Sequence, residues 1–150
     1  RGTTNEFMIR IYEATEPSDL LAEAFARLLP QLSERMTAPD REAVARIVAS
    51  PATRQLVAAA EDGRIVGLLS VALYDVPSGR KAWIEDVVVD AAARGRGIGE
   101  ALVREALALA CREGVARVML TSNATRRAAH RLYERMGFVR YETDCFRLDL

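Results

Sequence analysis

Three features of this sequence carry groups that can do chemistry. Glu85 and Asp86 are adjacent carboxylates that stand directly before three valines, and a carboxylate can accept a proton or bind a cation. Tyr133 lies in a helix-like stretch and carries a phenol that can donate a proton. The turn from Arg94 to Gly99 is rich in glycine and arginine, a composition that favours anion binding. The sequence therefore combines proton-transfer groups with a candidate anion site.

The glycine-rich turn is the most specific of these features. It has the sequence RGRGIG and lies between a valine-rich strand and a predicted helix, a geometry that points main-chain N–H groups toward an anion. Glycine lacks the Cβ atom that would hold a pyrophosphate away from the backbone. Arg94 and Arg96 add positive charge, and the dipole of the following helix adds to the attraction. The turn is therefore predicted to bind phosphate.

Spacing separates this turn from two other phosphate-binding motifs. A dinucleotide fold needs G-x-G-x-x-G, whereas Glu100 occupies the place of the third glycine. A P-loop ends in Gly-Lys-Ser or Gly-Lys-Thr, and the only lysine of the chain is Lys81. The pattern that fits is R-x-x-G-x-G, formed by Arg94, Gly97 and Gly99.

This pattern resembles the pyrophosphate-binding turn of the GNAT family of N-acetyltransferases. A second motif, from Asn123 to Phe138, lies in register with the first and ends in LYERMGF. The resemblance extends over nearly all of residues 8–150. It implies an enzyme that transfers the acetyl group of acetyl-CoA to a primary amine of a small molecule or peptide, by direct attack in a ternary complex. A catalytically silent acyl-CoA-binding sensor or regulatory domain stays open as the alternative, and the acceptor amine is not identified.

By this resemblance, acetyl-CoA is a co-substrate that is bound largely by main-chain groups, and no metal takes part. Val87, Val88 and Val89 would lie along the pantetheine arm and pair with it like an added strand. The residues that would hold the pyrophosphate are Arg94, Gly95, Arg96, Gly97, Ile98, Gly99 and Glu100. Asn123 would contact coenzyme A, and a helix-capping role for it is equally open.

The same resemblance gives roles to the tyrosine and the carboxylates. Tyr133 would protonate the departing thiolate, and a tyrosine that simply packs in the core is the competing interpretation. Glu85 is the preferred general base, with Asp86 or a water chain as alternatives, and both carboxylates would bind the amine, as in the glucosamine-6-phosphate N-acetyltransferases that the run IEDVVV resembles. Because neighbours on a strand point to opposite faces, at most one carboxylate should face the cleft unless the strand bulges. A solvated, exposed pair is the other interpretation.

Periodic patterns predict the elements that position these groups. Alternation and β-rich runs predict strands at about 8–12, 55–61, 64–74, 81–90, 116–121, 138–141 and 145–148. Apolar residues at helical spacing predict helices at about 20–29, 39–50, 97–112 and 125–136. The order β-αα-βββ-α-β-α-ββ predicts an α/β (α+β) fold of the GNAT type, in which helices flank both faces of one mixed, mostly antiparallel sheet.

Length and charge limit the remaining possibilities. A chain of 150 residues is predicted to form one domain over residues 8–150, and residues 1–7 are interpreted as a remnant added for expression. The 21 basic and 21 acidic residues cancel, so we expect neither a nucleic-acid partner nor an anionic membrane partner. No apolar run is long enough to span a bilayer and no signal peptide opens the sequence, which predicts a cytoplasmic protein. A homodimer is compatible with this composition.

The two cysteines are too few and too far apart to indicate a disulfide scaffold or a metal site. Cys111 and Cys145 are therefore expected to be packed thiols.

Overall fold

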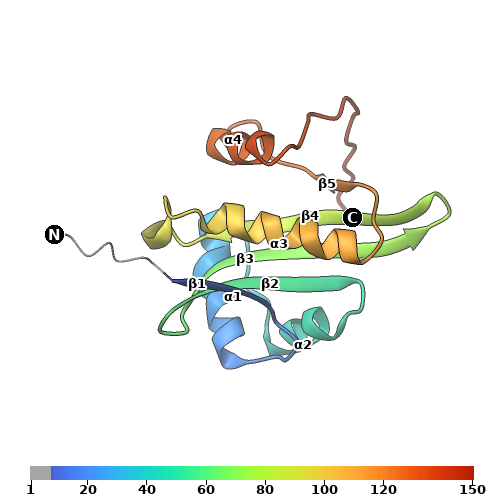
Figure 1. Cartoon of the computed structure of the whole chain (residues 1–150). Coiled ribbons are helices and arrows are strands. Elements are labelled where there is room, and N and C mark those ends of the chain that lie inside the picture. The colour runs from blue at the N-terminus through green and yellow to red at the C-terminus, as the bar shows by residue number, and fades with distance from the viewer. Residues whose placement is uncertain (1–7) are drawn as a thin grey trace.

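A five-stranded sheet organises residues 8–150, the part of the chain that this computed structural model describes (Figure 1). In spatial order the strands are β1 (Ile9–Glu13), β2 (Thr53–Ala60), β3 (Ile65–Val76), β4 (Gly79–Val89) and β5 (Val118–Leu120). The helices are α1 (Asp19–Leu32), α2 (Arg41–Ala49), the 3-10 helix η1 (Ala91–Ala93), α3 (Ile98–Arg112) and α4 (Arg127–Arg135). The interpretation of residues 1–7 as an added remnant lies outside the described residues.

Strands β1 to β4 form an antiparallel meander, and β5 joins its edge in parallel orientation. The predicted hairpin at Asp62-Gly63 connects β2 to β3. Strand β5 is short and pairs with β4 only between residues 82–84 and 118–120. The remainder of β4, toward Val89, continues past the last paired residue of β5.

Each face of the sheet is covered by its own hydrophobic cluster. In Figure 1, α3 runs along one face, while α1 and α2 lie on the other. The cluster on the α3 face includes Leu69, Ile84, Leu102, Ala106 and Tyr133. The cluster on the α1 face includes Leu21, Phe25, Leu28, Val44, Leu68 and Val88. Both helices of the α1 face begin at side-chain caps, because Ser18 accepts from the Leu21 N–H at 3.1 Å and Asp40 accepts from the Ala43 N–H at 2.8 Å.

Strand β4 contains a bulge at the predicted carboxylate pair. Glu85 pairs with Ser70, but Val88 pairs with Leu68, so the single residue between Ser70 and Leu68 faces both Asp86 and Val87. Asp86 has a φ of +49°, a left-handed conformation that aspartate tolerates better than most residues. The extra residue changes the alternation of side chains, and both carboxylates consequently lie on the α1 face.

The predicted fold class and the element order as far as α4 are confirmed, but the two closing strands are wrong. Residues 138–141 and 145–148 form no strand, and the chain beyond α4 is a segment without helix or strand that loops away from α4 and then turns back toward the sheet (Figure 1). Alternating apolar residues favour a strand, but a strand also needs a neighbour that accepts and donates its main-chain hydrogen bonds. Within residues 8–150, that neighbour is not supplied.

Two predictions about the surface have different outcomes. Cys111 and Cys145 are both exposed, so the expectation of packed thiols is wrong. Cys111 lies on the outer side of α3, and Cys145 belongs to the segment that follows α4. No helix in the described part of the chain is both long and apolar enough to cross a membrane.

Candidate functional site

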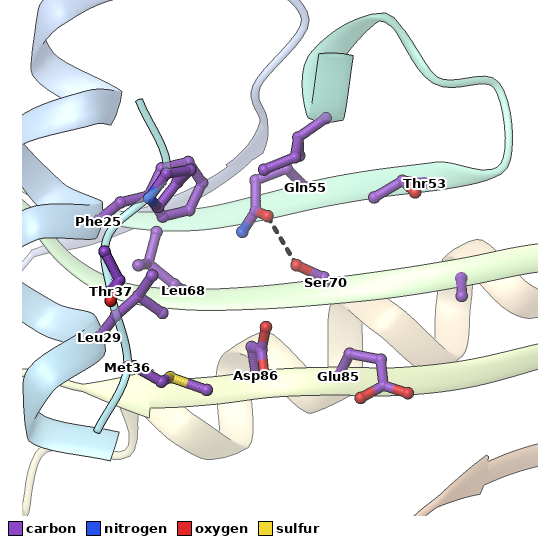
Figure 2. A pocket seen from close by; sticks show the side chains of 13 residues that line it. Phe25, Leu29, Met36, Thr37, Thr53, Gln55, Leu68, Ser70, Glu85 and Asp86 are labelled. Carbon is purple, nitrogen blue, oxygen red and sulfur yellow. Dashed lines mark hydrogen bonds between the residues drawn. The ribbon is translucent and has the colours of Figure 1, made fainter. Parts of the chain in front are cut away.

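A cavity of about 410 Å³ lies on the α1 face of the sheet, beside the β4 bulge (Figure 2). Its walls are formed by the C-terminal half of α1, the connection to α2, α2 itself, and β2, β3 and β4. The larger apolar residues that line it are Phe25, Leu29, Met36, Pro39, Ile47 and Leu68. The polar residues that line it are Thr37, Thr53, Gln55, Ser70, Glu85 and Asp86. Its size suits a small molecule or one side chain of a peptide.

The floor of this cavity is a row of polar side chains on three neighbouring strands. Gln55 of β2 is paired with Ser70 of β3, and Ser70 is paired with Glu85 of β4. Residues in register on adjacent strands share a face, so the three side chains lie side by side. Sequence reasoning missed Gln55 and Ser70. The signal that could have found them is a polar residue directly before or within an apolar run of each strand.

The hydrogen bonds of Gln55 determine what this row can offer a ligand. The Gln55 amide nitrogen donates to the carbonyl oxygens of Leu56 and Leu69, at 3.2 and 3.3 Å. Its amide oxygen accepts from the Ser70 hydroxyl at 2.6 Å. The hydroxyl proton of Ser70 is therefore already used, while the lone pairs of its oxygen can still accept. Gln55 is only 3% exposed, which holds this arrangement in place.

The two carboxylates at the bulge point in different directions. In Figure 2, the Asp86 carboxylate points toward β3, whereas the Glu85 carboxylate points toward the edge of β4 that faces away from β3. Burial in the cavity wall, followed by the negative charge of Asp86, raises the pKa of Glu85 above its ordinary value. The sequence predicted that at most one carboxylate would face the cleft unless the strand bulged. The strand does bulge, and both carboxylates line the cavity.

The outer edge of β4 is open beyond the carboxylates. Strand β5 pairs with β4 no further than Ile84, so residues 85–89 have a strand neighbour on the β3 side alone among the described residues. Val88 is buried on the α1 face, and Val87 and Val89 pack against the α3-face cluster. Their side chains thus form core, while main-chain groups along this edge can pair with an extended ligand.

The glycine-rich turn lies at the N-terminus of α3, as predicted. Gly95 and Gly97 have φ values of +78° and +74°, which favour glycine strongly, and Gly97 is the N-cap of α3. No side chain caps this helix, so its first N–H groups remain available to an anion. The side chain of Ile98 is buried in the α3-face cluster, so Ile98 can contribute only its main chain.

Charged side chains around the turn have protein partners. The Arg94 guanidinium donates to the Val89 carbonyl oxygen at 3.3 Å, and Glu100 forms an ion pair with Arg104 at 3.3 Å. Arg94 and Arg96 are both exposed at the turn. Their exposure allows both guanidinium groups to reach a bound anion, and pairing with Arg104 reduces the unfavourable charge of Glu100 at an anion site.

A buried ion pair that the sequence did not reveal anchors the approach to the turn. Asp90, which follows β4, accepts from Arg27 of α1 at 2.8 Å and from the Ala92 N–H at 3.1 Å. Gln31 accepts from the Ala91 N–H at 2.8 Å and donates to Asp90. Burial alone would raise the pKa of Asp90, but the hydrogen bonds from Ala92 and Gln31, together with the charge of Arg27, outweigh it and lower the pKa. These contacts tie the turn to α1.

Tyr133 lies on α4 and packs within the α3-face cluster. It is 7% exposed, and its ring meets Phe138 edge to face at 5.8 Å. Burial raises the pKa of its phenol, and the charge of Arg126 opposes this shift. No hydrogen bond to its hydroxyl is formed by residues 8–150. The core position predicted by the competing interpretation is present, and an unpaired hydroxyl leaves a proton-donor role open.

The loop between β5 and α4 contains two further polar groups. The Asn123 side chain accepts from the Thr125 N–H at 2.9 Å and from its hydroxyl at 2.8 Å, so Asn123 stabilises the turn before α4. The N-cap of α4 is Arg126, not Asn123. The hydroxyl oxygen of Ser122 is buried and has no partner among the described residues. Because buried hydroxyls are normally hydrogen-bonded, Ser122 is a candidate contact for a ligand between β4 and β5.

These features fit a long, phosphate-bearing coenzyme. The open edge of β4 supplies main-chain groups for an extended arm, the Ser122 hydroxyl is unpaired, and the start of α3 supplies N–H donors for a pyrophosphate. None of these groups is among the residues that line the cavity. Glu85, at the bulge, lies between them and the cavity.

Comparison with known proteins agrees with this geometry. A family model described as the acetyltransferase (GNAT) family matches residues 8–138. A probable glucosamine 6-phosphate N-acetyltransferase 2 from Oryza sativa subsp. japonica is 36% identical over 141 residues, which cover 87% of this chain and 81% of the rice protein. A mycothiol acetyltransferase from Renibacterium salmoninarum is 33% identical over 91 residues, or 59% of this chain, and the match spans only 27% of that protein. The crystal structure of a Trypanosoma brucei acetyltransferase has a TM-score of 0.77 and 29% identity, and the match covers 95% of this chain and all of that one.

Proposed function

Because this chain belongs to the acetyltransferase (GNAT) family and is an acyltransferase, we propose that it transfers the acetyl group of acetyl-CoA to a primary amine of a small molecule or peptide. The transfer takes place by direct attack of the amine in a ternary complex. We propose in addition that the enzyme depends on acetyl-CoA, needs no metal ion and is located in the cytoplasm.

One observation carries this proposal: the β4 bulge stands between the cavity and the open edge of the sheet. Glu85 and Asp86 line the cavity, and the unpaired edge of β4 begins at the same residues. An amine in the cavity and an extended coenzyme along the edge would therefore meet at Glu85. Effective catalysis between two molecules requires this kind of juxtaposition.

Different residues bind different parts of acetyl-CoA. When bound, acetyl-CoA supplies the thioester whose carbonyl carbon is attacked. Main-chain groups of Val87, Val88 and Val89 pair with the pantetheine arm, and residues 94–100 hold the pyrophosphate. Asn123, whose side chain is already engaged in the turn, and the neighbouring Ser122 contribute at the end of β5. Main-chain N–H groups near Val87 stabilise the carbonyl oxygen as negative charge develops on it.

Proton transfer is assigned to the two ends of the reacting centre. Glu85 accepts the proton that the amine loses as its nitrogen bonds to the acetyl carbon, and Asp86 holds the ammonium form before that step. The raised pKa of Glu85 supports this role, because a base works best when its pKa approaches the working pH. Tyr133 donates its proton to the sulfur as the carbon–sulfur bond breaks. Asp86 or a water chain is the alternative acceptor for the amine proton.

A thiol-release assay tests the proposal directly. Purified protein is mixed with acetyl-CoA and a panel of amines, amino sugars, aminoglycosides and peptides, and the free thiol is followed over time. We expect amine-dependent release that Glu85→Gln decreases and that Glu105→Gln, which changes a half-exposed carboxylate of α3, leaves intact.

Two results would contradict the proposal. Tight binding of acetyl-CoA without thiol release for any amine would identify a silent acyl-CoA sensor instead. Absence of acetyl-CoA binding in calorimetry would remove the assignment of residues 87–89 and 94–100. The name of the rice relative supplies glucosamine 6-phosphate as a first acceptor for the panel.

A further inference from the structure

The cavity beside the bulge offers a ligand a particular set of polar groups. Asp86 and Glu85 are carboxylates, which only accept hydrogen bonds when ionised. Ser70 has used its proton on Gln55, so toward the cavity it also accepts. Neither arginine nor lysine lines the cavity among the described residues. The floor and the bulge are therefore negative and accepting.

The opposite wall of the cavity is mostly apolar, with Thr37 as its polar residue. Phe25 and Leu29 of α1 and Met36 of the following loop face the carboxylates across the cavity, as Figure 2 shows. Water held in such a space is displaced at little cost by an apolar group of matching size. A phosphate there would lose its hydration and meet two carboxylates without a cation to offset them.

From this arrangement we propose that the acceptor is a primary amine with an apolar body, bound first as an ammonium ion by Asp86 and Ser70, and that phosphorylated amines are poor acceptors. This inference rests on the proposed acetyl transfer and names the substrate class of the same site. The apolar body lies against Phe25, Leu29 and Met36. The ammonium first loses one proton to Glu85, which releases it to solvent, so Glu85 can accept the second proton as the nitrogen bonds to the acetyl carbon.

The proposal separates this chain from the substrate named for its rice relative. Glucosamine 6-phosphate carries a phosphate and several hydroxyls, which need donors that this cavity supplies only through Thr37 and Thr53. An arylalkylamine such as phenethylamine matches the apolar wall and the carboxylates. Glucosamine without phosphate distinguishes the effect of the phosphate from that of the sugar.

Steady-state rates with these three amines test the proposal. We expect kcat/KM for phenethylamine to exceed that for glucosamine 6-phosphate by at least about 10²-fold, because the phosphate would meet two carboxylates without a cation to offset them. Asp86→Asn should raise KM for phenethylamine by about 10-fold, because it removes the charge that binds the ammonium group. KM for acetyl-CoA should stay unchanged, because asparagine also tolerates the positive φ at this position and the strand keeps its shape. Asp75→Asn, at the exposed end of β3, is the matched control.

The outcomes distinguish this inference from the proposed function. Fast turnover of glucosamine 6-phosphate, or an unchanged KM for phenethylamine in Asp86→Asn, would overturn the substrate class and leave acetyl transfer intact. Without turnover of any amine, calorimetric titration of phenethylamine into the protein with coenzyme A still tests the cavity. Binding that Asp86→Asn weakens supports the substrate class, and no binding contradicts it.

Discussion

The two sides of the β4 bulge have opposite chemistry. On the cavity side, the polar groups are two carboxylates and a serine oxygen that accept hydrogen bonds. On the other side, the available groups include the N–H donors at the start of α3 and the exposed Arg94. A cationic amine and an anionic coenzyme would each find a complementary environment a short distance apart. One strand with a bulge can therefore hold two substrates of opposite charge in separate environments while their reacting ends lie close together.

The largest expected effect comes from changing Tyr133, the proposed proton donor on the side of β4 where the coenzyme would bind. Tyr133→Phe should decrease kcat by about 10²-fold with little change in KM for either substrate, because only the proton for the leaving sulfur is lost. Stability should change little, since the hydroxyl has no protein partner within residues 8–150. Tyr141→Phe, at an exposed tyrosine, is the control. Full kcat in Tyr133→Phe would leave the tyrosine with a packing role alone.

The next effect tests Glu85 at the boundary between the two sides. Glu85→Gln should decrease kcat by at least about 10-fold and remove the acidic limb of its pH profile. In the wild type, kcat falls as the pH drops through the raised pKa of Glu85, because protonation removes the base. A variant that retains this limb would assign it to another group.

The same variant should lose activity but gain a little stability at high pH. A carboxyl group with a raised pKa in the folded state stabilises the fold most when it is protonated, and this contribution is lost as the pH rises through that pKa. Glu85→Gln should therefore unfold at a slightly higher temperature than the wild type at pH 8, by about 1 °C given the exposure of the side chain. The difference should disappear near pH 4, where both proteins are uncharged at this position.

Two glycines with the same backbone strain give a sharper test of the coenzyme side. Gly97 and Gly63 have φ values of +74° and +88°, and a Cβ atom at either would meet nothing within 4 Å. Gly97→Ala and Gly63→Ala should each lower stability by about 1 kcal/mol. Only Gly97→Ala should weaken acetyl-CoA binding in calorimetry, by about 10-fold, because its Cβ stands where the pyrophosphate approaches. Equal affinities would remove the turn from the binding site.

The smallest effect on activity concerns the anchor beneath the turn. Asp90→Asn should lower the unfolding temperature by about 3–8 °C, because it breaks a largely buried pair with Arg27, while acetyl-CoA affinity changes only about 2-fold. Asp19→Asn breaks the exposed pair with Arg41 and should have almost no effect. Since the pKa of Asp90 is lowered in the folded state, its contribution is present at neutral pH and lost on acidification. The gap between wild type and Asp90→Asn should therefore close toward pH 3.

Local patterns in the sequence were sufficient for most elements and for the anion turn. Helix caps, apolar periodicity and the Asp62-Gly63 turn depend on neighbours in the chain, so α1 to α4 and β1 to β4 follow from them. The turn at Gly95 and Gly97 is equally local, because its glycines set the backbone conformation that exposes the N–H groups. The family followed from the spacing of this turn and of the second motif.

Tertiary structure decided what depends on residues distant in the sequence. The bulge that brings both Glu85 and Asp86 to the cavity is a mismatch between two strands, and Gln55 and Ser70 become a polar floor only through strand register. Arg27 and Asp90 are 63 residues apart, so their pair could not be found from spacing. The closing strands failed for the same reason, since alternation prepares a strand but a neighbouring edge must complete it. Residue types and local spacing thus determined the chemistry available, and packing decided which groups meet.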